Sequence, residues 1–195
     1  MGTLLGIIGK LLGGRREEQG QRPRSASNAG QLDSRALVAK GRDLHEMGRD
    51  EDAIACYGKA LQADPGSANA WIEKGISLCM LRRDQEALRC YDHALRIRPE
   101  GDEHLWNNMA ISLAHLGRRE EAILCYDRAL SINPRLLDAW FNKAVSEEAI
   151  SRREEAAKSY RRFLTPAPAH PSRQVRHALA RLAEIDRGTT GAGRR

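Results

Sequence analysis

The sequence of 195 residues is poor in the residues that strands require. Aromatic residues make up 5% of the chain and only two phenylalanines are present, while valine and threonine are also scarce. Ala, Leu, Arg and Glu are abundant instead, and their side chains lose little rotamer freedom in a helix. The composition therefore predicts an all-α protein.

The sequence also lacks the motifs of catalytic and metal sites. The four cysteines form no C-x-x-C pair, and no histidine stands at the spacing of a zinc finger. The six histidines include no H-E-x-x-H motif, and there is no glycine-rich phosphate loop. His104 and His115 would lie on one face of a helix, where solvated histidines are commoner than a metal site. No nucleophile has a base at a plausible spacing, so we expect no enzyme activity, metal or cofactor, and a reducing cytoplasmic setting.

The net charge of +6 is concentrated at the two ends of the chain. Residues 34–170 contain 21 basic and 21 acidic residues, so this part is neutral. A nucleic-acid-binding protein is expected to gather Lys and Arg on one folded face. The neutral middle therefore makes a basic nucleic-acid adaptor the least favoured of the functions considered.

One pattern recurs four times along the chain. Four tyrosines follow one another at intervals of 34, 35 and 34 residues, each with Ala four positions before it and Pro eight positions after it. Tryptophan holds a common upstream register in three units, and glycine or alanine follows that position by four residues. The tyrosines are Tyr57, Tyr91, Tyr126 and Tyr160, the tryptophans Trp71, Trp106 and Trp140, and the small residues Gly41, Gly75, Ala110 and Ala144. An aromatic side chain facing a small residue lets two helices approach closely, so each unit predicts a pair of helices.

These residues resemble the tetratricopeptide repeat family over about 70% of the chain. The units are 34–67, 68–101, 103–136 and 137–170, with Asp102 as a one-residue insertion. The resemblance implies a right-handed superhelical solenoid of four helix-turn-helix repeats. The fourth unit departs from the pattern, because Glu147 replaces a leucine that the other units have at this position.

A further helix is expected after the fourth unit. Ser172 can cap a helix over 171–187, and its apolar residues Val175, Ala178, Leu179, Leu182 and Ile185 fall on one face. Such arrays need a capping helix to cover their last apolar surface. Residues 188–195 are expected to be a disordered tail.

The N-terminal residues 1–14 are not explained by the repeat. Their apolar side chains fill an arc of about 160° on a helix; these are Leu4, Leu5, Ile7, Ile8, Leu11 and Leu12. The segment is too short to span a bilayer. Three interpretations stay open: it docks in the plane of a membrane, it packs on its own or another subunit, or it is a tail without a role. Residues 15–33 are expected to be a flexible linker.

The resemblance implies a binding function, because the first helices of such repeats line a concave groove that binds a peptide or a partner helix. The groove positions here are Arg42, Asn69, Ile72, Ile76, His104, Asn107, Asn108, Ile111, Phe141, Asn142 and Val145. Internal packing is an equally good interpretation for several of the apolar ones. One subtype clamps the C-terminal carboxylate of its ligand with cations, which are missing at the matching positions here.

The three Cys-Tyr pairs belong to the repeat rather than to a reactive site. Cys56, Cys90 and Cys125 occupy the same place in successive units. Stacking would separate their sulfur atoms by at least ~8–10 Å, too far for a disulfide or a shared zinc ion. The sequence therefore predicts a cytoplasmic protein-interaction scaffold that residues 1–14 could tether to a membrane, with self-assembly through that segment as the main alternative.

Overall fold

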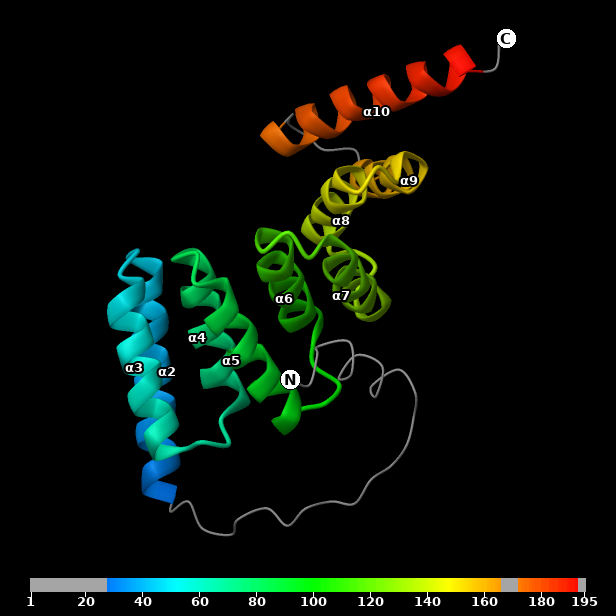
Figure 1. Cartoon of the computed structure of the whole chain (residues 1–195). Helices are drawn as coiled ribbons and strands as arrows, with labels where there is room; N and C mark the ends of the chain where they lie inside the picture. The colour runs from blue at the N-terminus through cyan, green and yellow to red at the C-terminus, as the bar shows by residue number, and fades with distance from the viewer. Residues whose placement is uncertain (1–27, 166–171, 193–195) are drawn as a thin grey trace. The chain divides into compact units, whose positions relative to one another are not determined.

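The computed structural model describes residues 28–165 and 172–192, which form nine α-helices and no strand (Figure 1). The first four are α2 (Asn28–Glu46), α3 (Asp50–Ala63), α4 (Ala68–Met80) and α5 (Asp84–Ile97). They are followed by α6 (Glu103–His115), α7 (Arg119–Ile132), α8 (Leu137–Ala149), α9 (Arg153–Leu164) and α10 (Arg173–Ala192). Each of the four predicted units contains one pair of helices, and the all-α fold class is confirmed.

The chain divides into two compact units after Gly101. The first unit contains α2 to α5 and the second contains α6 to α10. Asp102, the inserted residue, opens the second unit, and its carboxylate accepts a hydrogen bond of 2.8 Å from the backbone N–H of Leu105. The extra residue therefore serves as the N-cap of α6.

The tyrosine of each repeat fixes how closely its two helices approach. Tyr57 and Tyr91 are fully buried, and their rings lie directly over Gly41 and Gly75. A methyl carbon added to either glycine would lie 2.4 Å from the nearest carbon of the facing ring. In the second unit, Tyr126 and Tyr160 are buried in the same register, with buried alanines in place of the glycines. The contact between an aromatic ring and a small residue, which was inferred from the sequence, therefore sets the spacing of the two helices in each repeat of the first unit.

The turn inside each repeat contains one residue with a left-handed backbone. These residues are Gly48, Arg82, Gly117 and Ser151, with φ of 73°, 61°, 76° and 64°. The connection to the next repeat is fixed by its tryptophan: the indole N–H of Trp71 donates to the carbonyl of Pro65 at 3.1 Å, and Trp140 donates to Pro134 at 2.9 Å. Proline thus ends one helix and also supplies the acceptor that orients the next.

Two helix ends differ from the sequence-based expectation. α2 begins at Asn28, inside the predicted linker 15–33, and α10 continues to Ala192, beyond the predicted end at 187. Neither added stretch contains proline, so nothing in it forces the helix to stop. The segment 1–14 lies outside the described residues. Within the described part of the chain, no helix is long and apolar enough to cross a membrane.

The capping helix α10 packs on the fourth repeat as predicted. Val175, Ala178 and Ile185 join a buried cluster with Tyr160 and Phe163. Ser172 accepts a hydrogen bond of 3.2 Å from the backbone N–H of Val175 and so acts as the expected cap. Leu179 was expected on the docked face but is 53% exposed. On a helical wheel it lies about 40° beyond Val175, at the edge of the docked arc.

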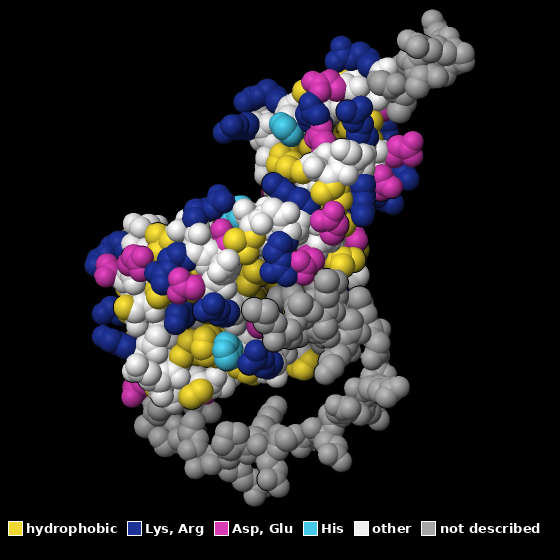
Figure 2. Space-filling view, in the orientation of Figure 1, with side chains coloured by type: hydrophobic (Ala, Val, Ile, Leu, Met, Phe, Trp, Pro, Cys, Tyr) yellow, Lys and Arg dark blue, Asp and Glu magenta, His cyan; other side chains and the backbone are white. Residues whose placement is uncertain are grey.

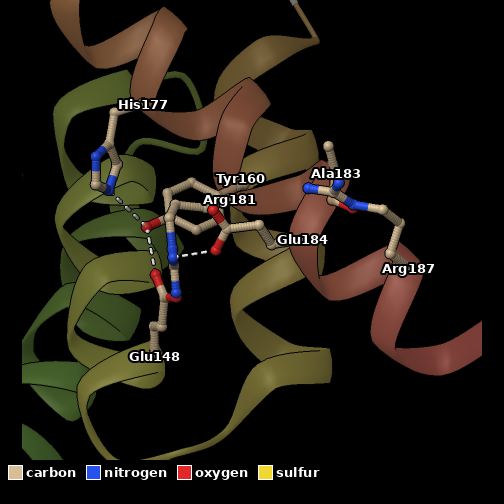
Figure 3. Close-up of polar contacts among 7 residues, drawn as sticks. All are labelled: Glu148, Tyr160, His177, Arg181, Ala183, Glu184 and Arg187. Carbon is tan, nitrogen blue, oxygen red and sulfur yellow. Dashed lines mark hydrogen bonds and ion pairs between the residues drawn. The ribbon is translucent and has the colours of Figure 1, made fainter. Parts of the chain in front are cut away.

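A polar network fastens α10 to the repeat below it (Figure 3). The carboxylate of Glu148 accepts a hydrogen bond of 2.6 Å from the Nε of Arg181 and one of 3.1 Å from the hydroxyl of Tyr160. Burial would raise the pKa of Glu148, but the hydrogen bonds from Arg181 and Tyr160 outweigh it and hold the pKa below its ordinary value. His177 lies 3.5 Å from the same hydroxyl. Glu148 is therefore anchored as a carboxylate.

The preceding residue, Glu147, has the opposite environment. It is 3% exposed, and it accepts a hydrogen bond of 2.7 Å from the hydroxyl of Ser159. Lys143 lies 3.6 Å away. Burial raises the pKa of Glu147 above its ordinary value, because these two partners offset only part of the desolvation cost. The departure seen in the sequence is thus a buried acid at a position that is leucine in the other repeats.

The glycine–tyrosine contact makes a testable prediction about stability. We expect Gly75→Ala to lower the free energy of unfolding by about 1–2 kcal/mol, because overpacking against the Tyr91 ring outweighs the better helix propensity of alanine. Urea denaturation followed by circular dichroism measures the change. Gly58→Ala in α3 is the control, since nothing lies within 4 Å of the added carbon. It should raise stability by about 0.5–1 kcal/mol, and a gain from Gly75→Ala as well would contradict the account.

Glu147 and Glu148 should affect the pH dependence of stability in opposite ways. The raised pKa of Glu147 means that its ionisation costs stability as the pH rises above its ordinary value of 4.5. We therefore expect the free energy of unfolding of Glu147→Gln to increase relative to that of the wild type as the pH rises above 4.5. The lowered pKa of Glu148 contributes stability above 4.5 that is lost as the pH falls below it.

Glu148→Gln should accordingly cost about 1–2 kcal/mol at neutral pH, and this cost should shrink in acid. Urea denaturation of both variants and the wild type between about pH 3.5 and pH 7 tests the pair. If the free energy of unfolding of both variants changed with pH in the same direction relative to the wild type, the environments assigned to Glu147 and Glu148 would be wrong.

Candidate functional site

In the first unit, the predicted polar groove positions interact within the chain. The guanidinium of Arg42 on α2 forms an ion pair of 2.7 Å with Glu73 on α4, and it is the one arginine among the predicted positions. The side-chain oxygen of Asn69 accepts a hydrogen bond of 3.3 Å from Arg98. Ile72 is 9% exposed and Ile76 is half-buried. The positive charge of Arg42 is therefore balanced by its neighbour.

In the second unit, α6 carries four of the predicted positions. Asn107 is 8% exposed, and its side-chain oxygen has no hydrogen-bond partner among the described residues. Asn108 and Ile111 are half-buried, one helical turn apart. His104 is exposed, with Nε2 3.9 Å from a carboxylate oxygen of Glu103. α6 thus has one half-buried amide, Asn108, and the half-buried Ile111 outside the buried Trp106–Ala110–Leu113 face.

The positions on α8 have two different environments. Asn142 is half-buried, and its side chain makes no hydrogen bond to another described residue, as is also true of Asn108. Phe141 faces α9 and α10, with its ring centroid 5.3 Å from that of Phe163 and 5.7 Å from that of His177. Val145 packs against the same cluster. A ligand-binding role for Phe141 and Val145 stays a prediction, because their contacts are with the fourth repeat and its cap.

Asn108 and Asn142 are two predicted asparagines that are half-buried and make no side-chain hydrogen bond to a described residue. They occupy equivalent places in successive repeats, 34 residues apart. Their helices α6 and α8 are in contact within the second unit. Each amide can both donate and accept a hydrogen bond. This pair, with the half-buried Ile111 beside it, is the candidate binding surface.

The first unit also contains a polar cluster that sequence reasoning missed. The Nδ1 atom of His45 lies 2.6 Å from a carboxylate oxygen of Asp50 and 3.4 Å from the hydroxyl of Ser77. A catalytic Ser-His-Asp relay places the serine and the aspartate on different ring nitrogens. Here both contact the same nitrogen, so the geometry is not that of the relay. Only the recurrence of serine at Ser77, Ser112 and Ser146 hints at this position in the sequence.

The Cys-Tyr pairs have the environment of packing residues. None of the four cysteines, all of which lie in the described part of the chain, is in a disulfide. Cys90 and Cys125 are buried, and Cys56 is half-buried. Burial raises the pKa of the Cys90 thiol to about 11, so at neutral pH it is protonated and a poor nucleophile.

The sequence matches models of a known repeat family. Tetratricopeptide repeat models match residues 38–102 and 105–136. A comparison with curated protein sequences finds no match.

Solved structures share the fold at low sequence identity. The structure of pilF from Pseudomonas aeruginosa aligns with a TM-score of 0.70 and 19% identity, covering 84% of this chain and 72% of that chain. YrrB, described as a TPR protein with an unusual peptide-binding site, aligns with a TM-score of 0.64 and 19% identity over 83% of this chain and 93% of its own. The first TPR of Spaghetti (RPAP3), bound to an HSP90 peptide, aligns with a TM-score of 0.59 and 21% identity over 62% of this chain and 98% of its own.

At these identities the structural likeness shows the fold alone. The repeat period, the paired helices and the matching family models agree with one another. The chain therefore belongs to the tetratricopeptide repeat family.

Proposed function

We propose that this chain is a non-enzymatic protein–protein interaction scaffold that binds a peptide segment or a partner helix on the first helices of its repeats. Tetratricopeptide repeats generally mediate protein interactions, and two of the structural relatives are described with peptides or a peptide-binding site. The observation that carries the proposal is the pair of half-buried amides, Asn108 and Asn142, which no described residue engages.

The spacing of the two amides suits an extended peptide. Packed helices lie about 8–10 Å apart, and three residues of an extended strand span about 10 Å. One amide could therefore bond the ligand backbone at one residue, and the other amide could bond it about three residues further on. Because each amide is both donor and acceptor, it can satisfy either a carbonyl or an N–H of that backbone.

The surroundings of the pair favour an uncharged ligand segment. Ile111 offers an apolar contact one turn beyond Asn108 on α6. We therefore propose a ligand that contributes backbone hydrogen bonds and one apolar side chain at this surface, rather than a terminal carboxylate.

The amide pair can be tested with peptides selected from a random phage library panned on the full chain. We expect Asn108→Ala combined with Asn142→Ala to weaken binding of a selected peptide by about 2 kcal/mol, or roughly 30-fold in Kd, because two hydrogen bonds are lost. Isothermal titration calorimetry measures the affinity.

Gln62→Ala combined with Gln85→Ala is the matched control, since it removes two exposed amides from second helices, α3 and α5. It should leave the Kd unchanged. An equal loss in both double variants, or no enriched peptide at all, would count against the proposed surface.

We also propose that residues 1–14 tether the scaffold to a membrane. The support is the apolar arc in the sequence together with five glycines, which make the segment a poor helix in water and favour its folding on a surface. The alternative is self-assembly, with the segment of one subunit docked on another.

Deleting residues 1–14 separates these two proposals. If the segment is a tether, the deletion should abolish co-sedimentation with liposomes and leave the oligomer size unchanged in light scattering. A fall in oligomer size, with no liposome binding by the intact chain, would instead establish self-assembly. Circular dichroism of the deletion variant checks that the repeats remain helical.

A further inference from the structure

The outer face of α5 carries three neighbouring side chains that can donate hydrogen bonds to an anion. Arg89, His93 and Arg96 are separated by one helical turn each and lie within an arc of about 60° on a helical wheel. All three are exposed. Neither arginine forms an ion pair or a hydrogen bond with another residue of the described chain. Their donors are therefore available to a ligand.

The imidazole ring of His93 is held in place by a tryptophan. It stacks on Trp71 of α4, with the ring centroids 4.3 Å apart and the ring planes 13° from parallel. Trp71 is itself fixed, because its indole N–H donates to the carbonyl of Pro65 at 3.1 Å. An imidazole has at least one N–H to donate whatever its charge. The stack therefore orients a hydrogen-bond donor between two guanidinium groups before a ligand binds, which lowers the ordering cost of binding.

The positive charge of this face is not cancelled by the acidic residues of α5. Glu86 accepts two hydrogen bonds of 2.8 Å from Arg83, one on each carboxylate oxygen. Asp92 precedes Arg96 by one turn, but no ion pair joins the two in the described chain. On α4, Lys74 places a further cation 5.9 Å from the centroid of the Trp71 ring. Figure 2 shows Lys and Arg side chains around a histidine and hydrophobic side chains in the region where α4 and α5 lie in Figure 1.

The packing of the repeat does not require this set of residues. All four second helices bury their tyrosine in the same way. The three positions are nevertheless occupied by Ala55, Lys59 and Gln62 in α3, by Leu124, Arg128 and Ser131 in α7, and by Lys158, Arg162 and Thr165 in α9. Only the second repeat combines two arginines with a histidine here.

We propose that Arg89, His93 and Arg96 form a binding site for a phosphate monoester. Such a group carries between about 1.5 and 2 negative charges at neutral pH and has three strong acceptor oxygens. These oxygens match two guanidinium groups and one imidazole N–H, and guanidinium groups bind phosphate in a bidentate manner. A nucleic acid would need cations along a longer track, whereas residues 34–170 are neutral as a whole.

The site goes beyond the proposed function, because it lies on a second helix and uses none of the first-helix positions. The phosphate could be carried by a phosphorylated side chain of a partner or be free in solution. Both sources present the same chemistry to the three side chains, so the probes have to distinguish them.

The test is an NMR titration of the full chain with inorganic phosphate and with the capped tripeptide glycine–phosphoserine–glycine. We expect the imidazole signals of His93 and the backbone amide signals of α5 to shift with both probes, and not with the unphosphorylated tripeptide. Arg89→Gln combined with Arg96→Gln should weaken binding about 10-fold, since each exposed ion pair contributes about threefold. Added salt should weaken the binding to the wild type.

Lys40→Gln combined with Lys59→Gln is the matched control. It removes the same charge from exposed positions of α2 and α3 in the same unit, and it should leave phosphate binding unchanged. Asn108→Ala combined with Asn142→Ala should also leave it unchanged, so that a failure of this proposal is distinguished from a failure of the peptide-binding surface.

Tighter binding of the phosphorylated tripeptide would support the proposal and assign the phosphate to a partner side chain, whereas tighter binding of inorganic phosphate would support it with a free ligand. The absence of shifts in α5 with both probes, or an equal loss of affinity in the control, would overturn the proposal. Binding of a single-stranded RNA that is lost in Arg89→Gln/Arg96→Gln, with no response to either phosphate probe, would assign the face to nucleic acid and overturn it too. Unchanged circular dichroism in every variant excludes unfolding as the cause.

Discussion

The contact between a buried tyrosine and a small residue on the neighbouring helix governs this structure. In the first unit the rings of Tyr57 and Tyr91 lie so close to Gly41 and Gly75 that no side chain fits between them. This contact brings the two helices of a repeat together and fixes which face of each is buried. The left-handed turn residues and the tryptophan-to-proline hydrogen bonds then connect successive pairs. The opposite faces of the first helices are left for other contacts.

The fourth repeat shows how the array ends. Its buried Glu147 replaces an apolar residue, whereas Glu148 anchors Arg181 of the capping helix. Two adjacent carboxylates therefore have opposite roles, because one is desolvated and the other is held by charge-assisted hydrogen bonds. The same hydrogen bonds hold α10 against the fourth repeat.

The sequence predicted what depends on local periodicity. The interval between tyrosines located four helix pairs, Ser172 was predicted as a cap and found as one, and Glu147 was noticed as a departure. Contacts between elements could not be predicted in this way. The ion pair of Arg42 with Glu73 joins residues 31 positions apart, and Phe141 meets His177 across the last connection. Leu179 fits the apolar pattern of α10 but lies just outside the arc that α9 covers. Only the structure therefore shows that Asn108 and Asn142 make no side-chain hydrogen bond to a described residue, whereas other predicted positions do interact within the chain.

The central claim is that the first helices bind a ligand through these two asparagines. The most direct measurement is an NMR titration of the protein with a peptide selected from the phage library. It follows the signals of the asparagine and glutamine side-chain NH₂ groups. We expect shifts for Asn108 and Asn142, with none for Gln62 and Gln85 on the second helices. Shifts confined to the second helices, with Asn108 and Asn142 unmoved in the complex, would contradict it.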